Sequence, residues 1–294
     1  MKLRTLLGDY PVTAALRHGR LKSDLVELDF AEVKTASAAF KRVVRENEFD
    51  FAELAIVTYL VALAHGKPYV LLPTVLVARF QHPFLVYNAG RGTLGPRDLA
   101  GKRIAIRSYS VTTVTWIRGI LAQDYGLDLD QVRWVTFEEP HVPEFKDPPN
   151  LERAPAGKDP AGMLLAGEVD AAILGDKKPD DPRIKTVFPD PRAAAEEWQR
   201  KHRALQINHM TVVKRELAER HPEIVRELYR LLWESRRAAS APVDLLPFGV
   251  EANRRHLEVA IDTVYRQGLI PRRFSVDELF DRTTREMNAL GGRD

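Results

Sequence analysis

The chain has 294 residues, of which 45% are hydrophobic and 29% charged, and its net charge is only +3. This balance suits one large or two medium globular domains, and the interspersed basic and acidic residues do not favour a nucleic-acid surface. No run approaches the roughly 20 apolar residues of a membrane span. Cysteine is absent, which excludes disulfides, thiolate metal sites and a cysteine nucleophile.

The first part of the chain alternates strands with helices. Strands are expected at residues 2–7, 24–30, 50–56, 69–77 and 83–88, and helices at 12–18, 36–45 and 56–64. This alternation indicates an α/β domain with a mostly parallel sheet. Gly90, Gly92 and Gly95 then match the letters of a dinucleotide-binding fingerprint. We reject that site because Pro96 follows at once and no helix opens there.

A turn between a strand and a helix, near residue 108, is the most informative local feature. Residues 103–107 are an apolar strand signal, and Ser110 is expected to cap a helix with an apolar face that includes Val114 and Ile117. Free N–H groups and the positive end of the helix dipole would meet at this turn, which is how proteins bind a carboxylate or phosphate. A capped helix without a ligand is the alternative.

The rest of the chain predicts a second domain and a return to the first. Strands are expected at 132–137, near 170, at 184–188 and at 207–213, with helices from 163 and at 193–202, 222–237 and 253–267. Ser275 and Glu278 form a capping box that opens a last helix. We therefore predict two lobes, one built from residues 1–88 with 206–294 and the other from 89–205. In such folds ligands bind between the lobes.

Two polar residues stand in apolar strands and are the catalytic candidates. Glu53 lies within FAELAIV, where a carboxylate is costly to bury unless it is paired or working. His209 lies in the otherwise apolar strand at 207–213 and could act as a general acid or base near neutral pH. For both residues, a hydrogen-bonded core side chain is the structural alternative.

A second set of side chains could bind an anionic ligand. Arg79 and His82 bracket a turn between two strands, and a guanidinium fork suits a carboxylate. A surface arginine and a packing histidine are the structural alternatives. No metal-binding motif is present, so no metal is expected, although Glu53, His82 and His209 could converge. The expected substrate-binding residues are Arg79, His82, Arg107, Ser108, Ser110, Thr112 and Thr113.

Several segments of the chain carry a family resemblance. They are GDY at 8–10, FDFAEL at 49–54, SYSVTTVTWIRGIL at 108–121, WVTFEEP at 134–140, LLAGEVDAAI at 164–173, VFPD at 187–190, PFGVEANRR at 247–255 and YRQGLIPRR at 265–273. Together they resemble the 4,5-dihydroxyphthalate decarboxylase-like family, whereas DLAGKR at 98–103 and AGEVDA at 166–171 resemble type II periplasmic-binding-protein folds more generally. The resemblance implies an α/β, two-lobed fold of that type, with a ligand cleft between the lobes and C-terminal helices. It also implies decarboxylation of a hydroxylated aromatic diacid.

Three functions remain open from the sequence. The first is a lyase of aromatic catabolism that decarboxylates a diacid of the 4,5-dihydroxyphthalate type, without a cofactor if a hydroxyl lies para to the departing carboxylate. The others are a substrate-binding protein of an ABC-type transporter for a small organic anion and a same-fold lyase of the menaquinone-pathway type. The start at Met1 lacks a signal-peptide core, which favours a cytoplasmic protein. The expected partner is a small aromatic carboxylate, not nucleic acid or a membrane, and a homo-oligomer stays open.

Overall fold

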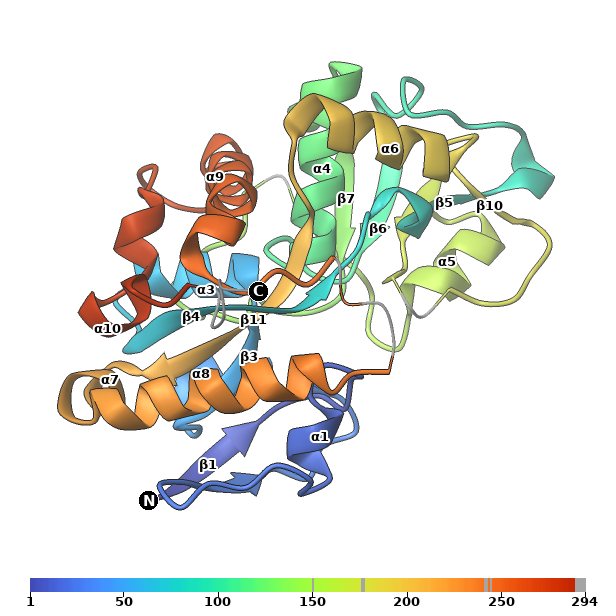
Figure 1. Cartoon of the computed structure of the whole chain (residues 1–294). Coiled ribbons are helices and arrows are strands. Elements are labelled where there is room, and N and C mark those ends of the chain that lie inside the picture. Colours follow the sequence, from blue (N-terminus) through green and yellow to red (C-terminus); the bar gives the residue numbers. More distant parts are fainter. Residues whose placement is uncertain (150, 176–177, 241–242, 244, 289–294) are drawn as a thin grey trace. The chain divides into compact units, whose positions relative to one another are not determined.

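The protein divides into two compact α/β units. The structure is a computed structural model that describes residues 1–149, 151–175, 178–240, 243 and 245–288. Unit 1 comprises Met1–Arg79 and Ile207–Asp294, and unit 2 comprises Phe80–Gln206 (Figure 1). The chain thus leaves unit 1 once and returns to it once.

In the sheet of unit 1, the ends of several strands lie at the same edge. Its strand order is β2-β1-β3-β11-β4. β1 pairs in parallel with β2 and β3, whereas β11 pairs antiparallel with β3 and β4. The C-terminal ends of β1, β3 and β4 therefore lie at the same edge as the start of β11. The bounds are β1 Lys2–Leu6, β2 Glu27–Phe30, β3 Phe51–Ala55, β4 Tyr69–Ala78 and β11 Ile207–Lys214.

Helices complete unit 1. The amphipathic α8 runs along the sheet (Figure 1) and buries Leu228 and Leu232 in one core with Phe51 and Val213. The expected capping box at Ser275 is confirmed, although it opens a short 3-10 helix. The helical bounds are η1 Ala36–Ala39, α1 Ala14–Arg17, α2 Phe40–Glu46, α3 Ile56–Ala64, α7 Arg215–Arg220, α8 Pro222–Arg237, α9 Val250–Arg266, η6 Val276–Leu279 and α10 Arg282–Arg285.

Unit 2 is built on a second sheet with the order β10-β5-β9-β6-β7-β8. Val86, Ala105, Val135 and Ala172 form its core with helix α5. β5 pairs antiparallel with β9 and β10, so the expected division after Asn88 is wrong and this strand belongs to unit 2. The bounds are β5 Leu85–Asn88, β6 Arg103–Ile106, β7 Arg133–Thr136, β8 Glu152–Arg153, β9 Ala171–Ile173, β10 Ile184–Thr186, η2 His82–Phe84, η3 Ala89–Arg91, η4 Leu129–Gln131, α4 Thr112–Tyr125, α5 Pro160–Ala166 and α6 Pro191–His202.

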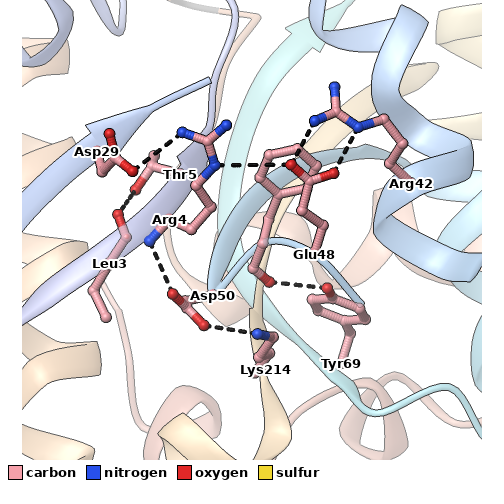
Figure 2. Close-up of polar contacts among 10 residues, drawn as sticks. Leu3, Arg4, Thr5, Asp29, Arg42, Glu48, Asp50, Tyr69 and Lys214 are labelled. Carbon is pink, nitrogen blue, oxygen red and sulfur yellow. Dashed lines mark hydrogen bonds and ion pairs between the residues drawn. The ribbon is translucent and has the colours of Figure 1, made fainter. Parts of the chain in front are cut away.

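A polar network fixes three strands of unit 1 near the start of β3. Figure 2 shows Asp50 between β1 and β11: its carboxylate accepts the backbone N–H of Arg4 and the ammonium of Lys214, both at 2.8 Å. Close by, the Tyr69 hydroxyl donates to the backbone carbonyl of Phe49 at 2.9 Å. One carboxylate thus ties the β1–β3–β11 arrangement together.

Replacing Asp50 with Ala should lower the free energy of unfolding by about 1–3 kcal/mol, because the backbone N–H of Arg4 loses its acceptor in a half-buried position. Asp29→Ala is the matched control, because the Asp29 carboxylate pairs with the Arg4 guanidinium and not with a backbone N–H in the described part of the chain, and it is 42% exposed. It should cost less than about 1 kcal/mol. Urea unfolding of both variants measures the difference in their free energies of unfolding. Equal losses would show that the hydrogen bond from the Arg4 N–H to Asp50 contributes nothing.

Candidate functional site

Glu53 and His209 lie on the same face of the unit 1 sheet. All five residues of β3 are buried, and strand alternation puts Glu53 on the face of Phe51. In the antiparallel register, His209 of β11 lies opposite Ala55, and Thr211 lies opposite Glu53. His209 is therefore the diagonal neighbour of Glu53, within reach across the two strands.

The Glu53 carboxylate is the centre of a hydrogen-bonded cluster. It is fully buried, and its Oε1 lies 2.6 Å from His209 Nδ1. Oε1 also accepts the Tyr10 hydroxyl, and Oε2 accepts the backbone N–H of Gly8, both at 2.8 Å. The structure thus brings together the two expected catalytic residues, which are far apart in the sequence.

This arrangement sets the orientation of the His209 ring. When the Glu53 carboxylate is ionised it can only accept hydrogen bonds, and Nδ1 of His209 then carries the proton that points to Glu53. Nε2 is then the nitrogen that remains for proton exchange, and Glu53 can balance the charge of an imidazolium. Because the His209 side chain is 18% exposed, it has access to solvent. Phe40 contacts the ring edge-to-face at 5.1 Å.

Gly8 and Tyr10 are site residues that the sequence did not reveal. Their loop follows β1, and Thr13 locks it by donating to the Gly8 carbonyl at 2.6 Å and accepting the Tyr10 N–H at 3.0 Å. A Cβ atom on residue 8 would lie 2.6 Å from the Tyr10 hydroxyl oxygen. Glycine is needed here because only it leaves room for the Tyr10 ring to reach Glu53. In the sequence, the signal for these two residues was the GDY segment, which ends the first strand.

A cavity of about 380 Å³ lies beside Tyr10 within unit 1. It adjoins the end of β4, where Val77 is the register partner of His209. Arg79 follows this strand end directly. The walls of this cavity are mostly apolar, which suits an aromatic ring. The lining residues are Tyr10, Pro11, Val12, Leu76, Val77, Ala78, Val243, Leu245 and Leu246.

The remaining expected binding residues lie in unit 2, most of them at the start of α4. The N-cap of α4 is Val111, without a side-chain cap, so the expectation that Ser110 caps this helix is wrong. Ser108 is fully buried, and its hydroxyl has no hydrogen-bond partner among the described residues. Thr112 is buried and Thr113 half-buried. Arg107 instead pairs with Glu138 at 2.9 Å.

Arg118 of α4 is a buried cation that the sequence reading overlooked. Its side chain is fully buried, and its guanidinium carbon lies 3.4 Å from the centre of the Tyr109 ring. Burial lowers the pKa of Arg118 to about 10, while its interaction with the Tyr109 side chain and the charge of Asp147 act in the opposite direction. The available signal was an arginine within the apolar run WIRGIL.

His82 lies away from this turn, at the other end of α4. It lines a cavity of about 180 Å³ with Asp124, Trp198 and Lys201. Because α4 has 14 residues, its ends are about 20 Å apart, so His82 does not share a site with Ser108. His82 is 1% exposed, and burial lowers its pKa to about 4, while the charge of Asp124 acts in the opposite direction.

The described residues include neither a metal-binding cluster nor a membrane-spanning helix. No three or more His, Asp and Glu side chains of the described ranges are grouped so that they could hold a metal ion. No helix in the same ranges is long and apolar enough to cross a membrane.

Comparison with known proteins identifies the family. A 4,5-dihydroxyphthalate decarboxylase of Comamonas testosteroni is 30% identical over 252 residues, which cover 81% of this chain and 76% of the relative. This chain belongs to the 4,5-dihydroxyphthalate decarboxylase family. The decarboxylase of Pseudomonas putida is 31% identical over 213 residues, covering 68% of this chain and 82% of the relative. A scan against protein-family models finds no match.

Solved structures confirm the fold expected for this decarboxylase family member. The periplasmic aliphatic sulphonate binding protein SsuA from Escherichia coli superposes with a TM-score of 0.60 at 13% identity, covering 95% of this chain and 96% of SsuA. The desulfurization enzyme DSZB superposes with a TM-score of 0.52 at 13% identity, covering 96% and 97%. The chain therefore has the periplasmic-binding-protein fold, which both a binding protein and an enzyme adopt.

Burial of His82 predicts a pH-dependent stability. Its folded pKa of about 4 lies below the ordinary 6.5, so the unfolded chain takes up this proton first as the pH falls. The free energy of unfolding should therefore decrease between pH 6.5 and 4, by up to about 3 kcal/mol from this group. Urea unfolding at about pH 7 and about pH 5 measures the decrease.

His82→Gln should reduce this decrease, whereas His65→Gln should not, because His65 is exposed. An equal pH dependence in wild type and His82→Gln would contradict the assignment.

Proposed function

We propose that this protein is a carbon–carbon lyase that decarboxylates a hydroxylated aromatic diacid of the 4,5-dihydroxyphthalate type. The observation that carries the proposal is the 2.6 Å contact between His209 Nδ1 and the buried Glu53 carboxylate. The names of two relatives at 30% and 31% identity indicate the substrate class. We further propose that the protein acts in the cytoplasm, in aromatic catabolism.

The reaction is a proton-for-carboxyl exchange on the ring. The hydroxyl para to the leaving carboxylate gives its proton to water, and the resulting phenolate pushes electrons into the ring while an acid protonates the carbon that bears the carboxylate. The bond to the carboxylate breaks, carbon dioxide leaves, and the electron pair of that bond restores the aromatic ring and the phenolate, which regains a proton. For 4,5-dihydroxyphthalate the product is 3,4-dihydroxybenzoate. Because the para oxygen of the substrate takes up this electron pair, the route needs no organic cofactor.

His209 and Glu53 have distinct roles in this route. His209, as the imidazolium, delivers the Nε2 proton to the ring carbon, since Nδ1 is held by Glu53. Glu53 stabilises the imidazolium and keeps its ring oriented, which is the usual role of a buried carboxylate behind a catalytic histidine. Tyr10 and Gly8 donate to Glu53 and keep that carboxylate in place.

The surroundings of the pair support an aromatic substrate. The mostly apolar cavity beside Tyr10 could take a benzene ring, because ligand pockets are lined mainly by apolar groups with a few polar ones. Arg79, directly after the cavity residue Ala78, would bind the carboxylate that stays on the ring. His82 has no role in this proposal, since it lines another cavity. Arg107 has none either, since it pairs with Glu138.

A solute-binding role is the second candidate, because the E. coli sulphonate-binding protein shares the fold. A shared fold does not establish a shared function. Such a role gives no reason for a histidine held by a buried glutamate. Incubation with a panel of aromatic acids, with carbon dioxide release followed over time, separates binding from turnover.

Replacing His209 with Asn should lower kcat for the active diacid by about 10²–10⁴-fold, the usual contribution of a general acid or base. The variant should fold normally and bind the diacid, because Asn retains one hydrogen-bond donor for Glu53. His18→Asn is the matched control: His18 also pairs with a carboxylate, Asp9 at 3.1 Å, but both side chains are 55% exposed. The control should keep full turnover.

Two results would count against the role of His209. Full turnover in folded His209→Asn would show that another group or water supplies the proton. Loss of folding, seen in far-UV circular dichroism, would indicate that this histidine serves the core.

A further inference from the structure

A segment that follows α8 forms one wall of the cavity beside Tyr10 in unit 1. The same cavity is lined by Val77 of β4, the register partner of His209, so this wall belongs to the surroundings of the proposed catalytic pair. Part of the wall is open to solvent, because Leu245 is 43% exposed. Burial alone therefore does not hold it in place. The wall residues are Val243, Leu245 and Leu246.

Arg236, in the last turn of α8, holds the wall through its backbone. Its Nε donates to the carbonyl of Leu246 at 2.9 Å, and its Nη2 donates to the carbonyl of Val243 at 3.1 Å. Both acceptors belong to residues that line the cavity. The guanidinium carbon also lies 5.5 Å from the centre of the Phe248 ring. One planar guanidinium thus fixes two points of the wall, with hydrogen bonds that its charge strengthens.

The residues directly after the wall are fixed to the edge of the sheet. Residues 247–249 lie along β4, where the Gly249 N–H donates to the carbonyl of Pro73 at 2.8 Å. The buried side-chain amide of Asn253 in α9 donates to the carbonyls of Pro247 and Gly249, at 3.0 and 2.8 Å. This is the PFGVEANRR segment of the sequence. It anchors one end of the wall, and Arg236 secures the rest.

We propose that Arg236 is a positioning residue that keeps the cavity wall in the conformation that an aromatic substrate contacts. The inference rests on the proposed function, because it concerns the same cavity. A segment that is already held loses little conformational freedom when a ring packs against it, which favours binding. The hydrogen bonds to Glu53 come from Gly8, Tyr10 and His209, and none of these residues belongs to the wall. Arg236 therefore acts on substrate binding and not on proton transfer.

Steady-state kinetics and calorimetric titration of the full-length protein with 4,5-dihydroxyphthalate test this role. Arg236→Ala should raise KM and Kd about tenfold, because the loosened wall must be ordered again when the ring binds. Its kcat should stay close to that of wild type, which is the reverse of the pattern expected for His209→Asn. Arg236→Lys should recover part of the affinity, because an ammonium can still donate to one of the two carbonyls.

Arg237→Ala is the matched control for the charge. It removes one positive charge from the next residue of α8, which is exposed, and it should change neither KM nor Kd. Leu245→Ala changes the wall itself. Because Leu245 is 43% exposed, this variant should fold normally, which far-UV circular dichroism checks. Loss of its apolar contact with the ring should raise KM and Kd several-fold.

The two proposals fail in different ways. Unchanged KM and Kd in folded Arg236→Ala, or an equal rise in Arg237→Ala, would overturn the role of Arg236 and spare the proposed function. A fall in kcat at constant KM would also overturn it, because Arg236 would then act on the chemical step. Binding of the diacid to wild type without carbon dioxide release would overturn the proposed function, and the Kd values of the variants would still decide for or against the wall.

Discussion

The structure of unit 1 depends on satisfying one buried carboxylate. Glu53 is fully buried, and it is tolerated there because the Gly8 N–H, the Tyr10 hydroxyl and the His209 ring all point at it. Removing one partner of a buried ion pair typically costs about 3–5 kcal/mol. The need to pair the Glu53 carboxylate therefore fixes the positions of the loop after β1 and the start of β11, in addition to apolar packing.

The sheet topology meets this requirement with residues from distant parts of the sequence. Because β1, β3 and β4 run in parallel and β11 runs against them, the loop after β1, the end of β3 and the start of β11 share one edge. Asp50 secures β1 and β11 near the start of β3. One end of the sheet is thus held by structural hydrogen bonds, and the other end holds the polar cluster with its adjoining cavity.

Strong local patterns predicted much of the fold. Glu53 and His209 were found in the sequence because each interrupts an apolar strand, and polar groups in such strands need partners. The capping box at Ser275 was found because its spacing alone defines it. These features need only local information, and the comparisons confirm the family that the longer motifs indicated.

Other features depend on tertiary contacts that the sequence does not encode locally. The strand Leu85–Asn88 was correctly expected, but its sheet could not be, because alternation does not reveal pairing partners. Serine is a common N-cap residue, yet α4 starts later than Ser110 predicts, at Thr112. In the sequence, Tyr10 resembles an ordinary turn residue. The structure shows that the missing Cβ of Gly8 leaves room for the Tyr10 ring.

We propose that the His209–Glu53 pair delivers a solvent-derived proton to a ring carbon as carbon dioxide leaves. The most direct measurement is turnover of 4,5-dihydroxyphthalate in deuterium oxide, followed by mass spectrometry and proton NMR of the product. The expected product is 3,4-dihydroxybenzoate with one deuterium at the carbon that lost its carboxylate, and one carbon dioxide is expected for each product molecule. Recovery of bound but unconverted diacid would contradict it.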